Sequence, residues 1–147
     1  MDAKPASKTR TFGWIFLVII GGLLTFGGFA STLIAYISSN NLGSDFHIDQ
    51  LRDADTSLVV AAQGRRGTAA SWAVSYGLML CFVASTAFRR GERWAWWSIL
   101  VTVGVGSLLV FLRVPLIHTQ LGVPTSLSLL VAVFIGLLVP VKDFFHG

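Results

Sequence analysis

Four long runs of apolar residues, separated by short polar segments, dominate the hydropathy pattern of this chain. They cover residues 12–37, 67–88, 94–117 and 125–141. Each has about the length that an α-helix needs to cross the hydrocarbon core of a bilayer, which is about 20 residues. The pattern therefore predicts an all-α, polytopic membrane protein, in which four antiparallel transmembrane helices form an up-down-up-down bundle.

The polar segments between these runs are predicted to be tails and loops of one membrane domain. They are a tail over 1–11, a large segment over 38–66, a turn over 89–93, a loop over 118–124 and a tail over 142–147. Only 12% of the residues are charged, whereas a soluble domain carries roughly a quarter. The composition therefore excludes an ordinary soluble protein.

The segment 38–66 contains apolar residues at helical spacing, which predict a short amphipathic helix lying outside the membrane. These residues are Ile48, Leu51, Ala54, Leu58 and Ala62. Glycine is common just after the end of a helix, so Gly64 is predicted to end this one.

The first apolar run follows a basic tail, which is also the pattern of a cleaved signal peptide. The run over 12–37 is too long for a signal peptide, and no clear Ala-x-Ala cleavage site ends it. An uncleaved first span is therefore favoured, and cleavage is the alternative.

The distribution of Lys and Arg predicts the orientation, because cytoplasmic loops of membrane proteins collect basic residues. Seven lie on one predicted side, namely Lys4, Lys8, Arg10, Arg89, Arg90, Arg93 and Lys142, and four on the other, namely Arg52, Arg65, Arg66 and Arg113. Both termini and the turn over 89–93 are therefore expected in the cytoplasm. The net charge of +4 is explained by contact with the lipid bilayer, and no nucleic-acid partner is expected.

Small residues recur every fourth position in three of the spans, and such residues let membrane helices approach closely. The predicted helix-packing residues are Gly27 and Ser31, then Ala69, Ala73, Gly77, Cys81 and Ser85, then Thr102 and Gly106, with Ser98 before them. This is more close-packing surface than a lone bundle requires. We therefore expect a non-enzymatic protein that works by helix association, as a homo-oligomer or as a subunit of a membrane complex.

The turn that begins at Arg89 holds the densest patch of charge. Arg89 and Arg90 complement the C-terminal dipole of one helix, and Glu92 complements the N-terminal dipole of the next. Gly91 is predicted to adopt a left-handed conformation. The expected interface anchors are Trp14, Trp72, Arg89, Arg90, Glu92, Arg93, Trp94, Trp96 and Trp97. A structural role explains the whole turn, and a docking site for a partner or an acidic lipid is the alternative.

Arg113 is the charge nearest to a membrane interior, which makes it a functional candidate. It lies close to the outer end of its span, where a long side chain can reach the headgroups. Pro115 can kink the helix beside it. The alternative function is therefore the binding or passage of a lipid or a small apolar ligand at an outer pocket near Arg113 and Pro115.

Other reactive residues give no site with a specific pattern. Asp45, His47, Asp49 and Asp53 match no zinc or calcium motif and have the spacing of a solvated face. Cys81 has no basic neighbour in sequence, so a small apolar role is favoured. No span carries an Asp, Glu, Lys or His in its middle, where proton relays lie. No catalytic residue, metal or cofactor is predicted.

The string from Arg89 to Trp96, Arg-Arg-Gly-Glu-Arg-Trp-Ala-Trp, resembles a turn of small, uncharacterised bacterial four-span membrane proteins. The resemblance covers the turn and the hydropathy layout, and it implies a bacterial inner-membrane location but no activity. Small multidrug exporters fit less well, because their first span carries a glutamate and the one glutamate here is Glu92, in a loop. The single cysteine, Cys81, argues against vitamin K epoxide reductase-like enzymes, tetraspanins and claudins.

Overall fold

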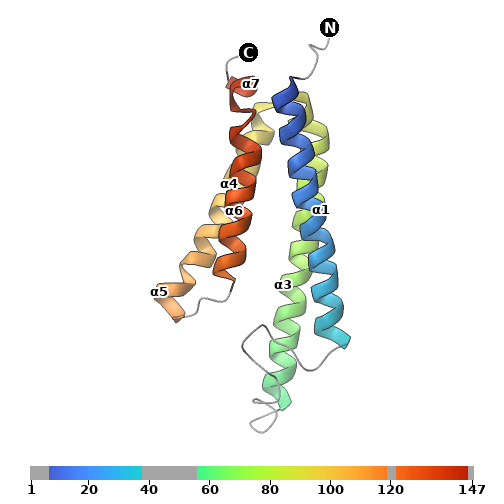
Figure 1. The fold of residues 1–147 in the computed structure, drawn as a ribbon. Helices are drawn as coiled ribbons and strands as arrows, with labels where there is room; N and C mark the ends of the chain where they lie inside the picture. Colours follow the sequence, from blue (N-terminus) through green and yellow to red (C-terminus); the bar gives the residue numbers. More distant parts are fainter. Residues whose placement is uncertain (1–6, 38–55, 119–121, 146–147) are drawn as a thin grey trace. The chain divides into compact units, whose positions relative to one another are not determined.

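The computed structural model describes residues 7–37, 56–118 and 122–145, and within these ranges the chain is helical and has no strand. The elements are α1 (Lys8–Ile37), α3 (Thr56–Val83), the π-helix η1 (Ala84–Phe88), α4 (Arg93–Phe111), α5 (Arg113–Ile117), α6 (Val123–Leu138) and α7 (Val141–Phe145) (Figure 1). The predicted all-α class is confirmed.

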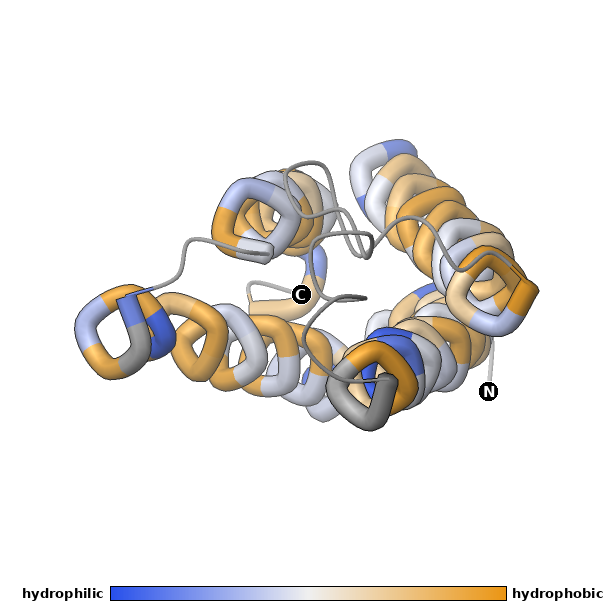
Figure 2. The backbone as a smooth tube through the Cα atoms, turned by 90° about the horizontal axis from the view of Figure 1, so that it is seen from below, coloured by the Kyte–Doolittle hydropathy of each residue, from blue (hydrophilic) through white to orange (hydrophobic). Residues whose placement is uncertain are grey.

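Three helices are long and apolar enough to span a membrane: Lys8–Ile37, Val59–Phe88 and Arg93–Leu116, with 30, 30 and 24 residues. Hydrophobic residues predominate along them (Figure 2). The fourth predicted span corresponds to α6, which is apolar but has only 16 residues. At 1.5 Å per residue it is about 24 Å long, against roughly 30 Å of hydrocarbon. Membrane association therefore rests on three helices, and the fourth span stays a prediction.

The predicted helix end at Gly64 is wrong, because α3 begins at Thr56 and continues through Gly64 without a break. A glycine costs a helix only about 1 kcal/mol. Here hydroxyl groups one turn later bond to the glycine carbonyls: Thr68 Oγ1 donates to the Gly64 oxygen and Ser71 Oγ to the Gly67 oxygen, each at 2.9 Å. Residues 45–55 of the predicted amphipathic helix lie outside the described residues.

The chain divides into two compact units, one formed by residues 21–79 and one by residues 1–20 and 80–147. In the unit 21–79, α1 and α3 approach closely at glycines. A Cβ added to Gly28 would lie 2.9 Å from both the Ala70 oxygen and the Val74 nitrogen. A Cβ on Gly77 would lie 2.6 Å from the Gly21 oxygen. Backbone therefore packs directly on backbone in this unit.

The partners in this unit follow one another in opposite sequence order. Gly77 lies against Gly21, whereas Gly67 lies against the ring of Tyr36, whose atoms would be 2.8 Å from an added Cβ. As residue numbers rise along α1, they fall along α3. Within the unit 21–79 the two helical segments therefore run in opposite directions.

One series of inward-facing positions along α3 and η1 alternates in steps of three and four residues, and other buried residues such as Leu80 and Ala87 lie beside it. The series consists of Gly67, Ala70, Val74, Gly77, Cys81, Ala84 and Phe88, each buried or half-buried. Such a pattern repeats every 3.5 residues on average, as in left-handed helix pairs. The predicted stripe of small residues runs from Ala69 to Ser85 and repeats every four residues. Each step moves it by about 40° around the helix axis, which adds up to about 160° over its length. Its two ends, Ala69 and Ser85, are consequently exposed.

In the unit 1–20/80–147, α4 packs on α6 and the start of α1 lies against α6. A Cβ on Gly13 would be 2.8 Å from Pro140 Cγ and 3.0 Å from the Gly136 oxygen. A Cβ on Gly136 would be 2.9 Å from Leu17 Cδ2. The largest fully buried side chains are Phe88, Leu17, Leu137, Val133 and Pro140, and all belong to this unit.

Two prolines explain where helices in this unit are interrupted. Proline has no N–H and crowds the carbonyl four residues earlier. Pro115 therefore cannot bond to Phe111, and α4 ends at Phe111 before α5 begins at Arg113. Pro140 stands in the same way between α6 and α7. The predicted effect of Pro115 on its span is thus seen as a break at Leu112, which keeps a right-handed helical conformation (φ −61°, ψ −19°).

Replacing Gly28 with Ala should destabilise the protein by about 1–3 kcal/mol, because the added methyl meets backbone atoms that cannot rotate away. The neighbouring Gly27 is a matched control, since a Cβ there meets nothing within 4 Å. Gly27→Ala should leave stability unchanged or raise it by up to about 1 kcal/mol. Thermal unfolding of both variants in one detergent, followed by circular dichroism, measures the difference. Equal effects would contradict the close approach at Gly28.

Candidate functional site

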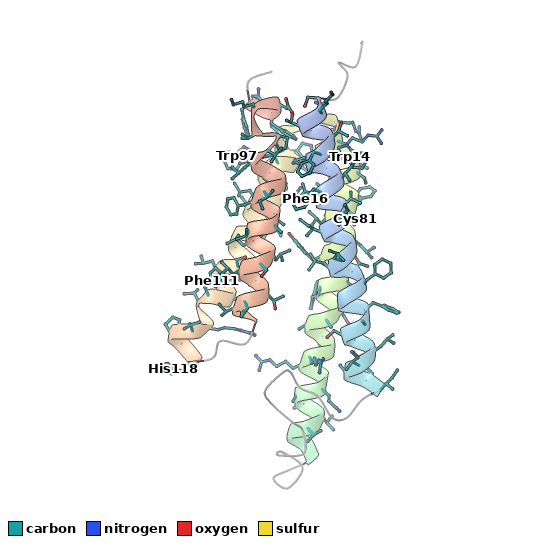
Figure 3. All side chains as sticks on the ribbon, in the orientation of Figure 1. Trp14, Phe16, Cys81, Trp97, Phe111 and His118 are labelled. Carbon is teal, nitrogen blue, oxygen red and sulfur yellow. The ribbon has the colours of Figure 1, made fainter. Side chains whose placement is uncertain are left out.

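Three segments far apart in the sequence meet at one end of the unit 1–20/80–147. Thr9 Oγ1 donates a hydrogen bond of 2.6 Å to the Asp143 carboxylate, and Ser7 Oγ donates to the same oxygen. Arg93 Nε donates to the Phe144 carbonyl at 2.9 Å. We call this region the basic end and define it as residues 7–10, 89–94 and 141–145. Trp14 and Trp97 lie near it (Figure 3).

The turn within the basic end has the backbone that its sequence predicts. Gly91 has φ +82°, which confirms the expected left-handed residue. Its N–H donates to the Phe88 carbonyl at 2.9 Å, and the Glu92 N–H donates to the Ala87 carbonyl at 3.1 Å. The Arg10 guanidinium lies against this turn, with one terminal nitrogen 2.6 Å from where a Cβ on Gly91 would stand. The left-handed conformation favours glycine, and an added Cβ would displace the end of the Arg10 side chain.

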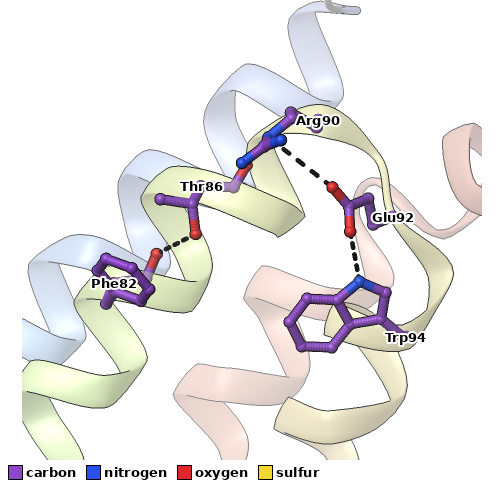
Figure 4. A network of polar contacts seen from close by, with 5 residues as sticks. All are labelled: Phe82, Thr86, Arg90, Glu92 and Trp94. Atoms are coloured by element: carbon purple, nitrogen blue, oxygen red, sulfur yellow. Dashed lines mark hydrogen bonds and ion pairs between the residues drawn. The ribbon is translucent and has the colours of Figure 1, made fainter.

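The Glu92 side chain has a different partner from the one expected. Glu92 is the N-cap residue of α4, but its carboxylate makes no capping bond to the backbone. It accepts a hydrogen bond from the Trp94 indole instead and lies 3.8 Å from Arg90 Nε (Figure 4). Arg90 also donates to the Thr86 carbonyl at 3.4 Å. Glu92 therefore ties the turn to the first residues of α4.

The three tryptophans after the turn differ in their surroundings. Trp94 and Trp97 are 54% and 52% exposed, whereas Trp96 is only 8% exposed. The Trp96 indole donates to the Leu137 carbonyl at 3.0 Å, and its ring meets the ring of Phe145 edge to face at 5.3 Å. The prediction of three interface anchors is therefore corrected for Trp96, which packs inside the unit because it lies on the side of α4 that faces α6.

Positive charge at the basic end exceeds negative charge by four. The cations are Lys8, Arg10, Arg89, Arg90, Arg93 and Lys142, and the acids are Glu92 and Asp143. Two arginines lie over aromatic rings: Arg89 is 5.2 Å from the Trp14 ring centroid and Arg93 is 5.9 Å from that of Phe145. Arg10 Nε is buried and has no hydrogen-bond partner. Among the described residues this end therefore keeps a net positive charge.

The hydroxyl groups of Ser7 and Thr9 hold the pKa of Asp143 below its usual value of 3.8. Partial burial acts in the opposite direction, and the Arg10 charge and backbone N–H add to the lowering. A carboxylate that accepts hydrogen bonds in its ionised form is harder to protonate. Asp143 is therefore ionised at neutral pH and joins the start of α1 to α7.

The predicted ligand residues Arg113 and Pro115 lie on the short helix α5, and both are exposed. A pocket beside them stays a prediction. Cys81 is half-buried and its thiol donates to the Val18 carbonyl at 3.4 Å, which suits the predicted packing role. Asp45, His47, Asp49 and Asp53 lie outside the described residues.

The predicted helix-packing residues separate into two groups. Gly77 is buried, and Ser31, Ala73 and Cys81 are half-buried. The exposed ones are Gly27, Ala69, Ser85, Thr102 and Gly106, together with Ser98. Of the expected anchors outside the turn, Trp14 is half-buried and Trp72 is 72% exposed.

Several contacts of this unit were missed by the sequence pattern. Gly13 and Gly136 bring α1 and α6 together, yet neither belongs to a run of small residues at helical spacing. Ser7 and Thr9 meet Asp143 across more than 130 positions of the chain. No local signal marks such a contact.

Neither models of known protein families, nor curated proteins, nor solved structures match this chain. The resemblance of the turn to small bacterial four-span proteins stays a prediction.

Replacing Trp96 with Phe should destabilise the protein by about 1–3 kcal/mol, because the buried hydrogen bond to the Leu137 carbonyl is lost. Trp97→Phe is the matched control, since Trp97 is half exposed, and it should change stability by less than about 1 kcal/mol. Thermal unfolding in detergent compares the two. A larger loss for Trp97→Phe would contradict the assignment of Trp96 to the packed side of α4.

Replacing Asp143 with Asn should lower the melting temperature at pH 7 by a few degrees, because the amide carries no charge for the two hydroxyls and Arg10. The folded pKa is lowered from 3.8, so the carboxylate stabilises the fold above that pH. Its contribution is lost as the pH falls through the lowered folded pKa. The gap between the wild type and the variant should thus narrow below pH 3.8 when melting is measured across a pH series. A gap that is constant with pH would contradict a role for the charge.

Proposed function

We propose that this chain is a four-span integral membrane protein that works without catalysis, by associating through its helices with a second copy or with another membrane protein. The proposal includes a plasma-membrane location with both termini in the cytoplasm. Its main support is a face of α4 that carries small residues and that the described chain leaves exposed.

The meeting of segments at the basic end supports four crossings. α1 starts there, η1 ends there, α4 starts there, and α6 leads back to it through α7. If α1, α3 and α4 each cross the bilayer, the end of α4 lies on the side opposite to the basic end. α6 then has to cross as well, because α7 lies at the basic end. Its 16 residues are slightly few, and local thinning of the bilayer accommodates a short span at modest cost.

The basic residues support the orientation. Six of the eleven Lys and Arg residues belong to the basic end. Cytoplasmic segments next to membrane spans carry such an excess. The basic end is therefore assigned to the cytoplasmic side.

The exposed face of α4 carries the proposal of association. Ser98, Thr102 and Gly106 lie four residues apart, and all three are exposed. A Cβ on Gly106 would meet nothing within 4 Å. Over three residues a four-residue repeat turns by only about 80°, so these positions stay on one side of the helix.

Larger apolar residues flank this face on the same side of α4. Val101, Val105 and Leu109 are 55%, 51% and 61% exposed. Small residues between larger ones let a second helix approach closely, and van der Waals packing then stabilises the pair in lipid. The glycines that the chain uses for its own packing, such as Gly28 and Gly77, lie elsewhere. The α4 face is therefore suited to a partner outside the chain.

Replacing Gly106 with Leu should weaken self-association, or the recovery of a partner, by roughly tenfold or more, because the side chain blocks close approach of a second helix. Energy transfer between labelled copies in liposomes measures self-association, and co-purification of a tagged chain from native membranes measures partners. Gly77 is unsuitable for this test, because it packs within the chain.

Gly104→Leu is the matched control. Gly104 lies on the same helix and a Cβ there also meets nothing within 4 Å, but it is off the exposed face. It should leave association unchanged. Both variants must keep the wild-type melting temperature. If Gly106→Leu is folded and associates as strongly as the wild type by both measurements, the proposal is wrong.

A further inference from the structure

We propose that the basic end binds the phosphate headgroups of anionic phospholipids. Six cations gather there from the start of α1, the turn before α4 and α7, against two carboxylates. This inference rests on the membrane location of the chain and is independent of helix association.

Both carboxylates of the basic end already have partners. Asp143 accepts hydrogen bonds from Ser7 and Thr9, and Glu92 accepts one from Trp94 while it lies near Arg90. The Arg10 charge also acts on Asp143, so the two carboxylates offset two of the six positive charges and leave an excess of four. An anion from outside the chain provides the missing countercharge.

Several arginines are held in place before any ligand arrives. Arg89 lies over Trp14, and Arg93 bonds to the Phe144 carbonyl and lies over Phe145. Side chains that are already ordered lose less conformational entropy on binding. Arg10 is half-buried, and its guanidinium lies against Gly91. Guanidinium groups match the geometry of phosphate.

Apolar surface beside the charges favours a lipid over a free phosphate ion. Phe12, Trp94 and Trp97 are 50%, 54% and 52% exposed, and each lies within four residues of Arg10 or Arg93 in sequence. A phospholipid presents acyl chains to such rings and a phosphate to the arginines. Aromatic and basic residues share this arrangement at membrane interfaces. A free ion would cover only the charges.

The test is native mass spectrometry of the full chain in a mild detergent, titrated with phosphatidylglycerol or with phosphatidylcholine of the same acyl chains. Phosphatidylglycerol should bind roughly tenfold or more tightly, given the usual strength of attraction between basic residues and anionic lipids. Inorganic phosphate added in excess should displace little of it. Equal binding of the two lipids, or full displacement by inorganic phosphate, would overturn the proposal.

A triple variant locates the site. Lys8→Gln, Arg89→Gln and Lys142→Gln remove one exposed cation from each segment of the basic end and should lower phosphatidylglycerol affinity by roughly tenfold or more. The control, Arg65→Gln, Arg66→Gln and Arg113→Gln, removes the same charge elsewhere and should retain most of the affinity. Equal losses would show that binding follows net charge alone and would overturn the proposal.

Two further variants separate charge from folding and from association. The single variant Arg89→Lys keeps the charge but loses the guanidinium that lies over Trp14, so it should lose less phosphatidylglycerol affinity than Arg89→Gln; an equal loss in the two folded variants would contradict a contribution of charge. Gly106→Leu should bind phosphatidylglycerol like the wild type. If Gly106→Leu loses helix association but still binds phosphatidylglycerol, the lipid proposal stands. If the triple variant loses phosphatidylglycerol but still associates, the association proposal stands.

Discussion

Direct contact between helix backbones is the constraint on which the rest of this structure depends. In the unit 21–79, Gly28 leaves no room for a Cβ between α1 and the backbone of α3. In the unit 1–20/80–147, Gly13 of α1 lies close to the Gly136 backbone oxygen of α6, and Gly136 leaves room for the side chains of Leu17 and Phe16. In lipid there is little hydrophobic force between helices, so van der Waals packing at such points is a main source of cohesion.

The sequence predicted the helical class and the long apolar segments, because the hydropathy of each segment follows from the residues in it, and folding does not change these. It also predicted the left-handed Gly91 and the break near Pro115, because both follow from the local chemistry of one residue. It failed at Gly64, where local chemistry permits a helix end but α3 continues without a break. Local rules therefore predict what a residue permits, and neighbours decide the outcome.

The packing faces were harder to predict, because they depend on the period of contact between helices. Small residues occur on several sides of α3, and a repeat of four selected Ala69 and Ser85 together with Gly77. The observed faces repeat every 3.5 residues and include Ala70 and Val74 instead. Trp96 shows the same difficulty in a single residue. Its neighbours Trp94 and Trp97 are exposed, and the positions of α6 and Phe145 explain why Trp96 is buried.

The basic end illustrates how one set of residues serves structure and recognition together. Stacking on Trp14 and Phe145 positions Arg89 and Arg93, and the bonds of Asp143 join α7 to the start of α1. These contacts use the aromatic rings and the carboxylates, and they leave the excess of positive charge in place. A fold that needed this charge only for topology could carry it on unstructured tails. Here arginines are ordered on a packed surface, which favours a defined anionic partner over a diffuse attraction to the membrane.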